Sequence, residues 1–199
     1  MTPRLRPIPR SEWDEDCAAA VRAGMPAAAA EKFLSAEDDA PRLANGITTL
    51  LHHPQLAAKF LNFNGQLLWE PVLSPRLREL VVLRVARRTH SQYEWVQHAK
   101  LSLRYDVTPE EVEAIAGDDD AVFSDVEADV LHATDQLLEC YRVEDDAWER
   151  LAQTLDEKAR LELLFVVGTY TALAMVFNGV GVELDPDLDP TSFPALPED

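Results

Sequence analysis

Residues 74–104 read SPRLRELVVLRVARRTHSQYEWVQHAKLSLR, and this stretch decides the fold class that the sequence predicts. Ser74 is a typical N-cap and Pro75 suits the first helical position, so a helix is expected to run from here to about Arg88. A second helix is expected over about 91–104. The connection between them is only about two residues long, which makes the two helices neighbours that pack in opposite directions.

Helical signals continue along the rest of the chain. Thr108 and Ser124 each begin a capping box, and Pro54 suits the first turn of another helix. No segment alternates between apolar and polar residues as a strand does, so the predicted fold class is all-α. The further helices are expected at about 11–21, around 27–30, at 54–68, 109–116, 125–140 and 145–155, and at 156–178.

Residues 163–182 contain no charged side chain. Their number would suffice to span a bilayer, but no basic cluster flanks them and acidic residues follow at once. The favoured interpretation is a central helix buried on all sides, with help from a partner chain, so we expect no membrane span and a homo-oligomer. We expect one domain over 1–185 and a tail over 186–199, rich in proline and acidic residues, that wraps a neighbour or is disordered.

Composition excludes several classes of protein. The chain has 199 residues, 47% of them hydrophobic, so most of it is not disordered. Its net charge of −18 repels phosphate backbones, and no nucleic-acid partner is expected. Cys17 and Cys140 are too few for a disulfide scaffold. No apolar run follows the basic N-terminal residues, so we expect no signal peptide and a cytoplasmic location.

The charges are unevenly distributed along the chain. Residues 106–157 hold eighteen acidic and two basic side chains, whereas residues 76–104 hold seven basic and two acidic ones. Two interpretations are open. The basic stretch is either a solvated face that balances other charges, or an electropositive pocket for a small anion.

Four residues of the quoted stretch are the main candidates for catalytic side chains. On a helix, Ser91, Glu94 and His98 share one face, and Glu94 is close enough to His98 for a hydrogen bond that would suit a general acid. Glu79 precedes an apolar run, and partial burial there would raise its pKa. The alternatives are an exposed Glu–His pair and an ordinary first-turn glutamate. His52 and His53 have no third ligand near them, so no metal site is predicted.

Four segments of the sequence resemble the carboxymuconolactone decarboxylase family, which includes the alkylhydroperoxidase D proteins. They are residues 51–56, 76–86, 93–98 and 168–178, and the resemblance extends over about 45–185. It implies an all-α fold of the alkylhydroperoxidase D-like type that oligomerises through long buried helices, as a trimer or as a hexamer made of trimers.

The resemblance also indicates a branch of the family. Its peroxidase branch uses a Glu, a CxxC pair and a His, of which Glu79 and His98 match the first and last. The two cysteine positions hold Ser91 and Glu94, so no thiol peroxidase activity is expected. The decarboxylase branch resembles this chain in the Tyr-Glu-Trp that precedes His98.

The resemblance implies a cofactor-independent lyase of aromatic degradation that acts on a small anionic lactone or a related carbonyl compound. His98 would be the acid/base, Glu94 its orienting partner and Glu79 a second proton-transfer carboxylate, with His98 and Glu79 lining one cavity. The substrate-binding candidates are Arg84, Arg87 and Arg88 as an anion clamp and Tyr93 and Ser91 as hydrogen-bond donors. The alternatives are another proton transfer, of an isomerase or dehydratase, and a non-catalytic oligomeric binding protein.

Overall fold

The computed structural model describes residues 2–35, 37 and 40–197. Within them the secondary structure consists of helices, and no residue is in a strand. The predicted all-α fold class is therefore confirmed. The chain divides into two compact units, each of which contains two stretches of sequence. Unit 1 is formed by the described residues of 1–71 and 180–185, and unit 2 by those of 72–179 and 186–199.

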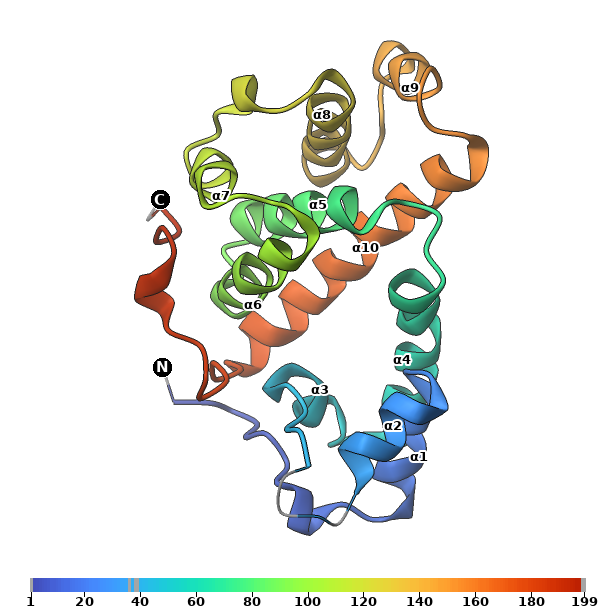
Figure 1. Ribbon diagram of the computed structural model, residues 1–199, viewed down its shortest axis with the longest axis vertical. Coiled ribbons are helices and arrows are strands. Elements are labelled where there is room, and N and C mark those ends of the chain that lie inside the picture. The colour runs from blue at the N-terminus through green and yellow to red at the C-terminus, as the bar shows by residue number, and fades with distance from the viewer. Residues whose placement is uncertain (1, 36, 38–39, 198–199) are drawn as a thin grey trace. The chain divides into compact units, whose positions relative to one another are not determined.

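Unit 1 is built around the packing of α1 on α4 (Figure 1). Its core contains Cys17 and Val21 of α1 and Ala57 and Leu61 of α4. Residues 183–185 join this unit near the start of α3, where the backbone N–H of Asn45 donates to the buried Asp185 carboxylate at 2.7 Å. The helices of unit 1 are η1 (Arg10–Glu12), α1 (Glu15–Ala23), α2 (Ala27–Leu34), α3 (Asn45–Leu50) and α4 (Pro54–Trp69).

Unit 2 is organised around α5, which packs against α6 on one side and α8 on another. Figure 1 shows α5 and α6 next to each other, as their short connection predicts. Its helices are α5 (Pro75–Arg88), α6 (Gln92–Ser102), η2 (Leu103–Tyr105), α7 (Pro109–Ala116), η3 (Asp120–Val122), α8 (Asp125–Cys140), α9 (Asp145–Leu151), α10 (Glu157–Val180) and η4 (Pro190–Ser192).

The helix starts follow the capping signals of the sequence. The capping boxes of Thr108 and Ser124 are both formed, and α7 and α8 have the predicted bounds. The Asp156 carboxylate accepts from the Ala159 N–H at the start of α10. The helix α3 was not predicted, because its six residues carry no local capping signal and its first turn is held by the distant Asp185.

One face of α10 is exposed in the described chain, and its expected burial with the help of a partner chain stays a prediction. Val166, Tyr170 and Ala174 are buried, whereas Phe165 is 49% and Met175 70% exposed. In the described part of the chain, α10 is the one helix long and apolar enough to cross a membrane, and length and composition alone do not distinguish such a helix from a core helix.

The C-terminal tail packs on α6 as far as the structure describes it. The indole Nε1 of Trp95 donates to the Pro194 carbonyl at 2.8 Å, and Lys100 pairs with Asp187 at 2.7 Å. Residues 186–197 therefore cover this chain's own site-bearing helix. The division of the chain into a domain of 1–185 and a tail stays a prediction.

Candidate functional site

The site begins with the burial of α5. Ser74 caps this helix by accepting from the Leu77 N–H, and Pro75 occupies its first turn. Every residue from Arg78 to Ala86 is buried, because α6, α7 and α8 all pack against the helix. Glu79 is 0% exposed, so a carboxyl group lies in the interior of unit 2. A carboxylate there needs charged or hydrogen-bonding partners.

The turn between α5 and α6 brings the second half of the site alongside the first. His90 adopts a φ of 51°, in the left-handed region, and the Ser91 N–H then donates to the Ala86 carbonyl at 2.9 Å. The chain reverses within residues 89–91, and α6 returns against α5. The inner face of α6 carries Glu94 and His98, and both are buried.

Glu79 and His98 form a buried hydrogen-bonded pair, and Arg78 is the third member of this cluster. His98 Nδ1 lies 2.7 Å from Glu79 Oε2, and the other carboxylate oxygen accepts from Arg78 Nε at 3.3 Å and from its terminal nitrogen at 3.2 Å. Arg78 is itself 3% exposed. The imidazole is thus fixed by Glu79 from one side, and Glu79 is fixed by Arg78.

The state of this pair follows from its charges. Burial alone would raise the pKa of Glu79, but the charge and hydrogen bond of His98, together with those of Arg78, outweigh burial and leave that pKa lowered. An ionised carboxylate only accepts, so Nδ1 of His98 carries the proton that it donates to Glu79. Nε2 is then the ring nitrogen that can take up or deliver a proton.

Glu94 differs from Glu79 because its buried carboxyl has no compensating partner. It is 2% exposed, and neither of its carboxyl oxygens has a hydrogen-bond partner. Burial raises the pKa of Glu94 to about 7, an effect that nearby Ser91 and the charge of His98 reduce in part. The buried Ser91 Oγ also lacks a hydrogen bond. A carboxyl in this state is a neutral acid in a large fraction of molecules near neutral pH.

Aromatic rings surround the pair. Tyr170 of α10 meets the His98 ring edge-on, with centroids 5.2 Å apart, and Tyr93 meets Phe177 in the same way at 5.1 Å. Arg78 lies over the Tyr105 ring at 5.5 Å. Burial and the Glu79 charge raise the pKa of Tyr170, which keeps its hydroxyl protonated. An apolar ring beside a buried pair lowers the local dielectric and so strengthens its electrostatic interactions.

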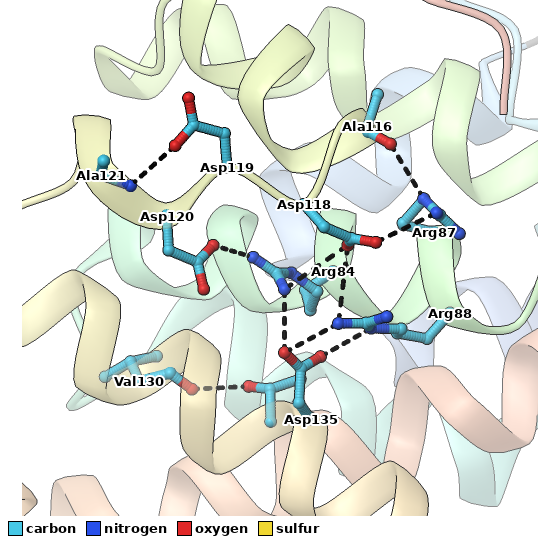
Figure 2. A network of polar contacts seen from close by, with 11 residues as sticks. Arg84, Arg87, Arg88, Ala116, Asp118, Asp119, Asp120, Ala121, Val130 and Asp135 are labelled. Carbon is cyan, nitrogen blue, oxygen red and sulfur yellow. Dashed lines mark hydrogen bonds and ion pairs between the residues drawn. The ribbon is translucent and has the colours of Figure 1, made fainter. Parts of the chain in front are cut away.

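The three arginines that the sequence predicts as an anion clamp instead form ion pairs with aspartates of the same chain. That expectation is therefore corrected. Figure 2 shows the guanidiniums of Arg84, Arg87 and Arg88 turned towards aspartates of the acidic stretch. Arg84 and Arg88 share Asp135 of α8, each at 2.8 Å. Arg84 also pairs with Asp120, and Arg87 pairs with Asp118. The basic stretch therefore balances the acidic one inside unit 2. The charge balance agrees with the first of the two interpretations, but Arg84 is 1% exposed, so the stretch is not a solvated face.

The partner of His98 also differs from the expectation. The sequence predicts that Glu94 orients the imidazole, but Glu79 makes that contact and Glu94 has no hydrogen bond. The i,i+4 spacing puts Glu94 on the correct face of α6 without bringing its carboxylate to the ring. The catalytic roles of His98, Glu79 and Glu94 stay predictions, as do those of Tyr93 and Ser91.

Sequence reasoning missed Arg78 and Tyr170. Arg78 is one of the seven basic residues of 76–104, and its position directly before Glu79 is the signal that the sequence offers. Tyr170 is the ionisable side chain of the uncharged stretch, and its contact with His98 depends on how α10 packs. Among the described residues, no group of three His, Cys, Asp or Glu side chains could hold a metal ion.

Neither of two hollows in the described surface includes this cluster. Each has a volume of about 410 Å³, and both are lined by residues of unit 1. One lies between the end of α1 and the end of α4, where Phe63 and Trp69 line it. Glu79 and His98 line neither, so the expected cavity around them stays a prediction.

Comparison with solved structures defines the class of fold. A peroxidase-related protein from Ralstonia eutropha JMP134, described as having an alkylhydroperoxidase AhpD core, superposes with a TM-score of 0.72 at 18% identity, over 92% of this chain and 94% of that one. The debrominase Bmp8 in complex with 2,3,4-tribromopyrrole has a TM-score of 0.70 at 14% identity, over 96% of both chains. At such identities the likeness shows the fold alone, which is that of the AhpD-like proteins.

The family comparison goes one step further. Residues 54–136 match the sequence model of the Carboxymuconolactone decarboxylase family, which confirms the resemblance over this segment. The segment contains Glu79, Ser91, Glu94 and His98. No curated protein matches the chain significantly.

Proposed function

We propose that the protein is a cofactor-independent enzyme that transfers protons on a small lactone or related carbonyl compound, in a reaction resembling that of 4-carboxymuconolactone decarboxylase. The observation that carries this proposal is the pair of buried carboxyls around one imidazole. Glu79 is ionised and holds His98 at 2.7 Å, whereas burial raises the pKa of Glu94 to about 7. Two titratable groups with separated pKa values are the usual basis of acid and base roles in one site.

In the decarboxylation, the bond between the substrate carbon and its carboxylate breaks and carbon dioxide leaves. The bonding electrons move into the lactone carbonyl and give an enolate oxyanion. Neutral Glu94 donates a hydrogen bond to that oxygen, which stabilises the charge that develops in the transition state. Protonated His98 then delivers the Nε2 proton to carbon, and Glu79 stabilises the imidazolium before transfer. The net reaction consumes one proton from water.

The proposed substrate is anionic, and the site has to supply its positive charge. Arg84, Arg87 and Arg88 are held by aspartates. The remaining cations of the cluster are protonated His98 and Arg78, which shares its charge with Glu79. This arrangement favours a substrate with a single carboxylate, because a second negative charge would have no cation of its own.

A peroxidase reaction is the less suitable candidate. Thiol peroxidases need a thiolate and a resolving thiol. Ser91 and Glu94 occupy the two positions of the family's cysteine pair, and Cys17 and Cys140 are free cysteines outside it. Similarity to a peroxidase-related protein and to a debrominase therefore supports the scaffold of the proposed enzyme and not their chemistry.

The test is a panel of small unsaturated lactone acids and related keto acids incubated in deuterium oxide and followed by proton NMR. We expect one panel compound to lose carbon dioxide and gain one carbon-bound deuterium. His98→Ala should slow this reaction about a hundredfold or more, the usual contribution of a general acid. His132→Ala, which changes an exposed histidine of α8, should leave the rate unchanged.

Deuterium exchange without loss of carbon dioxide would replace the decarboxylase with the second candidate, an isomerase-type or dehydratase-type proton transfer. Unchanged turnover in His98→Ala would contradict both. No turnover of any compound, together with tight binding of one, would indicate the non-catalytic binding protein.

A further inference from the structure

The helices α6, α7 and α8 begin with the same sequence pattern, a Ser or Thr at the N-cap and a Glu three residues later. This pattern is typical of a capping box, in which each of the two side chains accepts a hydrogen bond from the backbone N–H of the other residue. In α7 and α8 both hydrogen bonds are formed. In α6 the two positions hold Ser91 and Glu94, and among the described residues neither side chain makes its bond.

The turn between α5 and α6 explains why the capping box of α6 is not formed. A capping box needs the N-cap N–H as a donor, but the Ser91 N–H donates to the Ala86 carbonyl at 2.9 Å. The ψ of Ser91 is 87°, whereas the N-caps of α7 and α8 have values of 159° and 161°. Both side chains lie instead in the interior of unit 2, where Ser91 is 0% and Glu94 2% exposed.

Burial leaves both side chains without compensation. Within the part of the chain that the structure describes, the Ser91 Oγ and both carboxyl oxygens of Glu94 lack a hydrogen bond. A buried polar atom in this state lowers stability, and native proteins keep few of them. An N-cap Ser that bonds in the ordinary way would stabilise α6. Side chains that break a local rule at a cost in stability are expected where a ligand supplies the missing partners.

The position of the two side chains indicates the chemistry of that ligand. They lie at the N-terminal end of α6, a helix of eleven residues, where the helix dipole and the N–H groups of the first turn favour negative charge. The Ser91 hydroxyl is a hydrogen-bond donor, and Glu94 is one as well whenever it is protonated. The Ser91 side chain and the charge of His98 both act on the Glu94 carboxyl, so the three groups converge. Converging donors fit a ligand oxygen that carries negative charge.

We propose that Ser91 and Glu94 bind one negatively charged oxygen of a small carboxylate or enolate, each by donating a hydrogen bond to it. The inference rests on the proposed function, in which Glu94 donates to the oxyanion, and it adds Ser91 as the second donor to the same oxygen. Glu79 already holds the imidazole of His98 at 2.7 Å. His98 is therefore not needed to bind this oxygen, and its Nε2 is left to face the carbon that receives the proton.

Binding of 2-furoate to the full chain tests the proposal, because this compound carries one carboxylate on a five-membered ring. Backbone amide shifts in proton–nitrogen NMR give its Kd, and the neutral 2-furamide is the matched compound. We expect 2-furoate to bind at least about tenfold more tightly than 2-furamide. Ser91→Ala should weaken the binding of 2-furoate about tenfold or more, as the loss of one hydrogen bond to a charged group does. Ser124→Ala, the same change at the N-cap of α8, should leave it unchanged.

Thermal unfolding distinguishes a ligand-binding serine from a capping serine. Ser124→Ala removes a capping box that is formed and should lower the Tm by about 2 to 4 °C. Ser91→Ala removes a buried hydroxyl without a hydrogen bond, so the Tm should stay unchanged or rise. A loss in Ser91→Ala as large as that in Ser124→Ala would show that Ser91 caps α6, and the proposal would be overturned.

The binding assay also separates this proposal from the proposed function. Equal binding of 2-furoate by the wild type and by Ser91→Ala, or no binding by either, would overturn the two-donor site and leave the proton transfer to the turnover assay. Binding of 2-furoate no tighter than that of 2-furamide would exclude a site for an anion. If Ser91→Ala weakens binding but no lactone or keto acid is turned over, the two-donor site stands and only the proposed reaction is contradicted.

Discussion

The two carboxyls of the site differ in their surroundings and not in their chemistry. Glu79 has His98 on one oxygen and Arg78 on the other, whereas both oxygens of Glu94 are buried without a hydrogen bond. The partners of Glu79 lower its pKa, whereas burial without partners raises the pKa of Glu94. The two residues therefore change the stability of the folded protein with pH in opposite directions. The pH dependence of stability and of activity therefore reports on each residue separately.

Glu94 should make the folded protein less stable as the pH rises. The pKa of Glu94 is about 7 in the folded state and ordinarily 4.5, so the folded state binds more protons than the unfolded state between these limits. The stabilisation is fully present below pH 4.5 and is lost as the pH rises to about 7. Relative to Glu94→Gln, the wild type should lose roughly 3 kcal/mol of unfolding free energy over this window, measured by urea denaturation. Parallel curves for the two proteins would contradict the raised pKa.

Glu79 should act in the opposite sense and at lower pH. Its pKa is lowered in the folded state, so its contribution is present above about 4.5 and is lost as the pH falls through the folded value. Glu79→Gln should remove this acid-side loss and should also reduce turnover, because the imidazole then lacks a carboxylate partner. The measurement is the unfolding free energy below pH 4.5, alongside the rate at neutral pH. A Glu79→Gln protein with the stability profile and the turnover of the wild type would exclude the ion pair.

At the scale of helices, α5 is held by opposite charges on two sides. The contact of Glu79 with His98 lies towards α6, and the arginine network of Figure 2 lies towards α8 and the turn at 118–120. The network balances the basic and acidic stretches locally. Removing one partner of such a partly buried ion pair lowers the stability of the protein strongly, because the other charge is left without compensation.

Asp135→Asn tests the network. The change weakens the partner that Arg84 and Arg88 share and leaves the buried Arg84 with Asp118 and Asp120. We expect a loss of about 2 kcal/mol in thermal or urea unfolding. Asp119→Asn is the matched control, because Asp119 only accepts from the Ala121 N–H. Equal effects of the two substitutions would mean that the network does not stabilise α5.

The sequence predicted the helices of unit 2 well because their signals are local. Thr108, Ser124 and Pro75 mark helix starts through side-chain and backbone chemistry within one turn. It could not predict α3, which depends on Asp185 from 140 residues away. The sequence also indicated Glu79, Glu94 and His98 as site residues but predicted the wrong carboxylate as the partner of His98. Spacing along a helix predicts the face on which a residue lies, but it does not predict the direction in which its carboxylate points.

At the scale of the whole molecule, the positions of the two cysteines lead us to expect no thiol peroxidase activity. Cys17 is buried, where burial raises its thiol pKa, and Cys140 is exposed without a second thiol beside it. We expect no thiol-dependent peroxide consumption in a coupled assay with a dithiol reductant. Turnover that disappears in Cys17→Ser or in Cys140→Ser would contradict this prediction.

The central claim is that the buried cluster holds one ionised and one neutral carboxyl around His98. Carbon-detected NMR of glutamate side chains follows both groups through a pH titration without any substrate, and Glu79→Gln and Glu94→Gln assign the two signals. We predict a midpoint near pH 7 for Glu94 and one below 4.5 for Glu79. Two carboxyls that titrate together near 4.5 would show that the site has no built-in acid, and the proposed proton transfer would lose its basis.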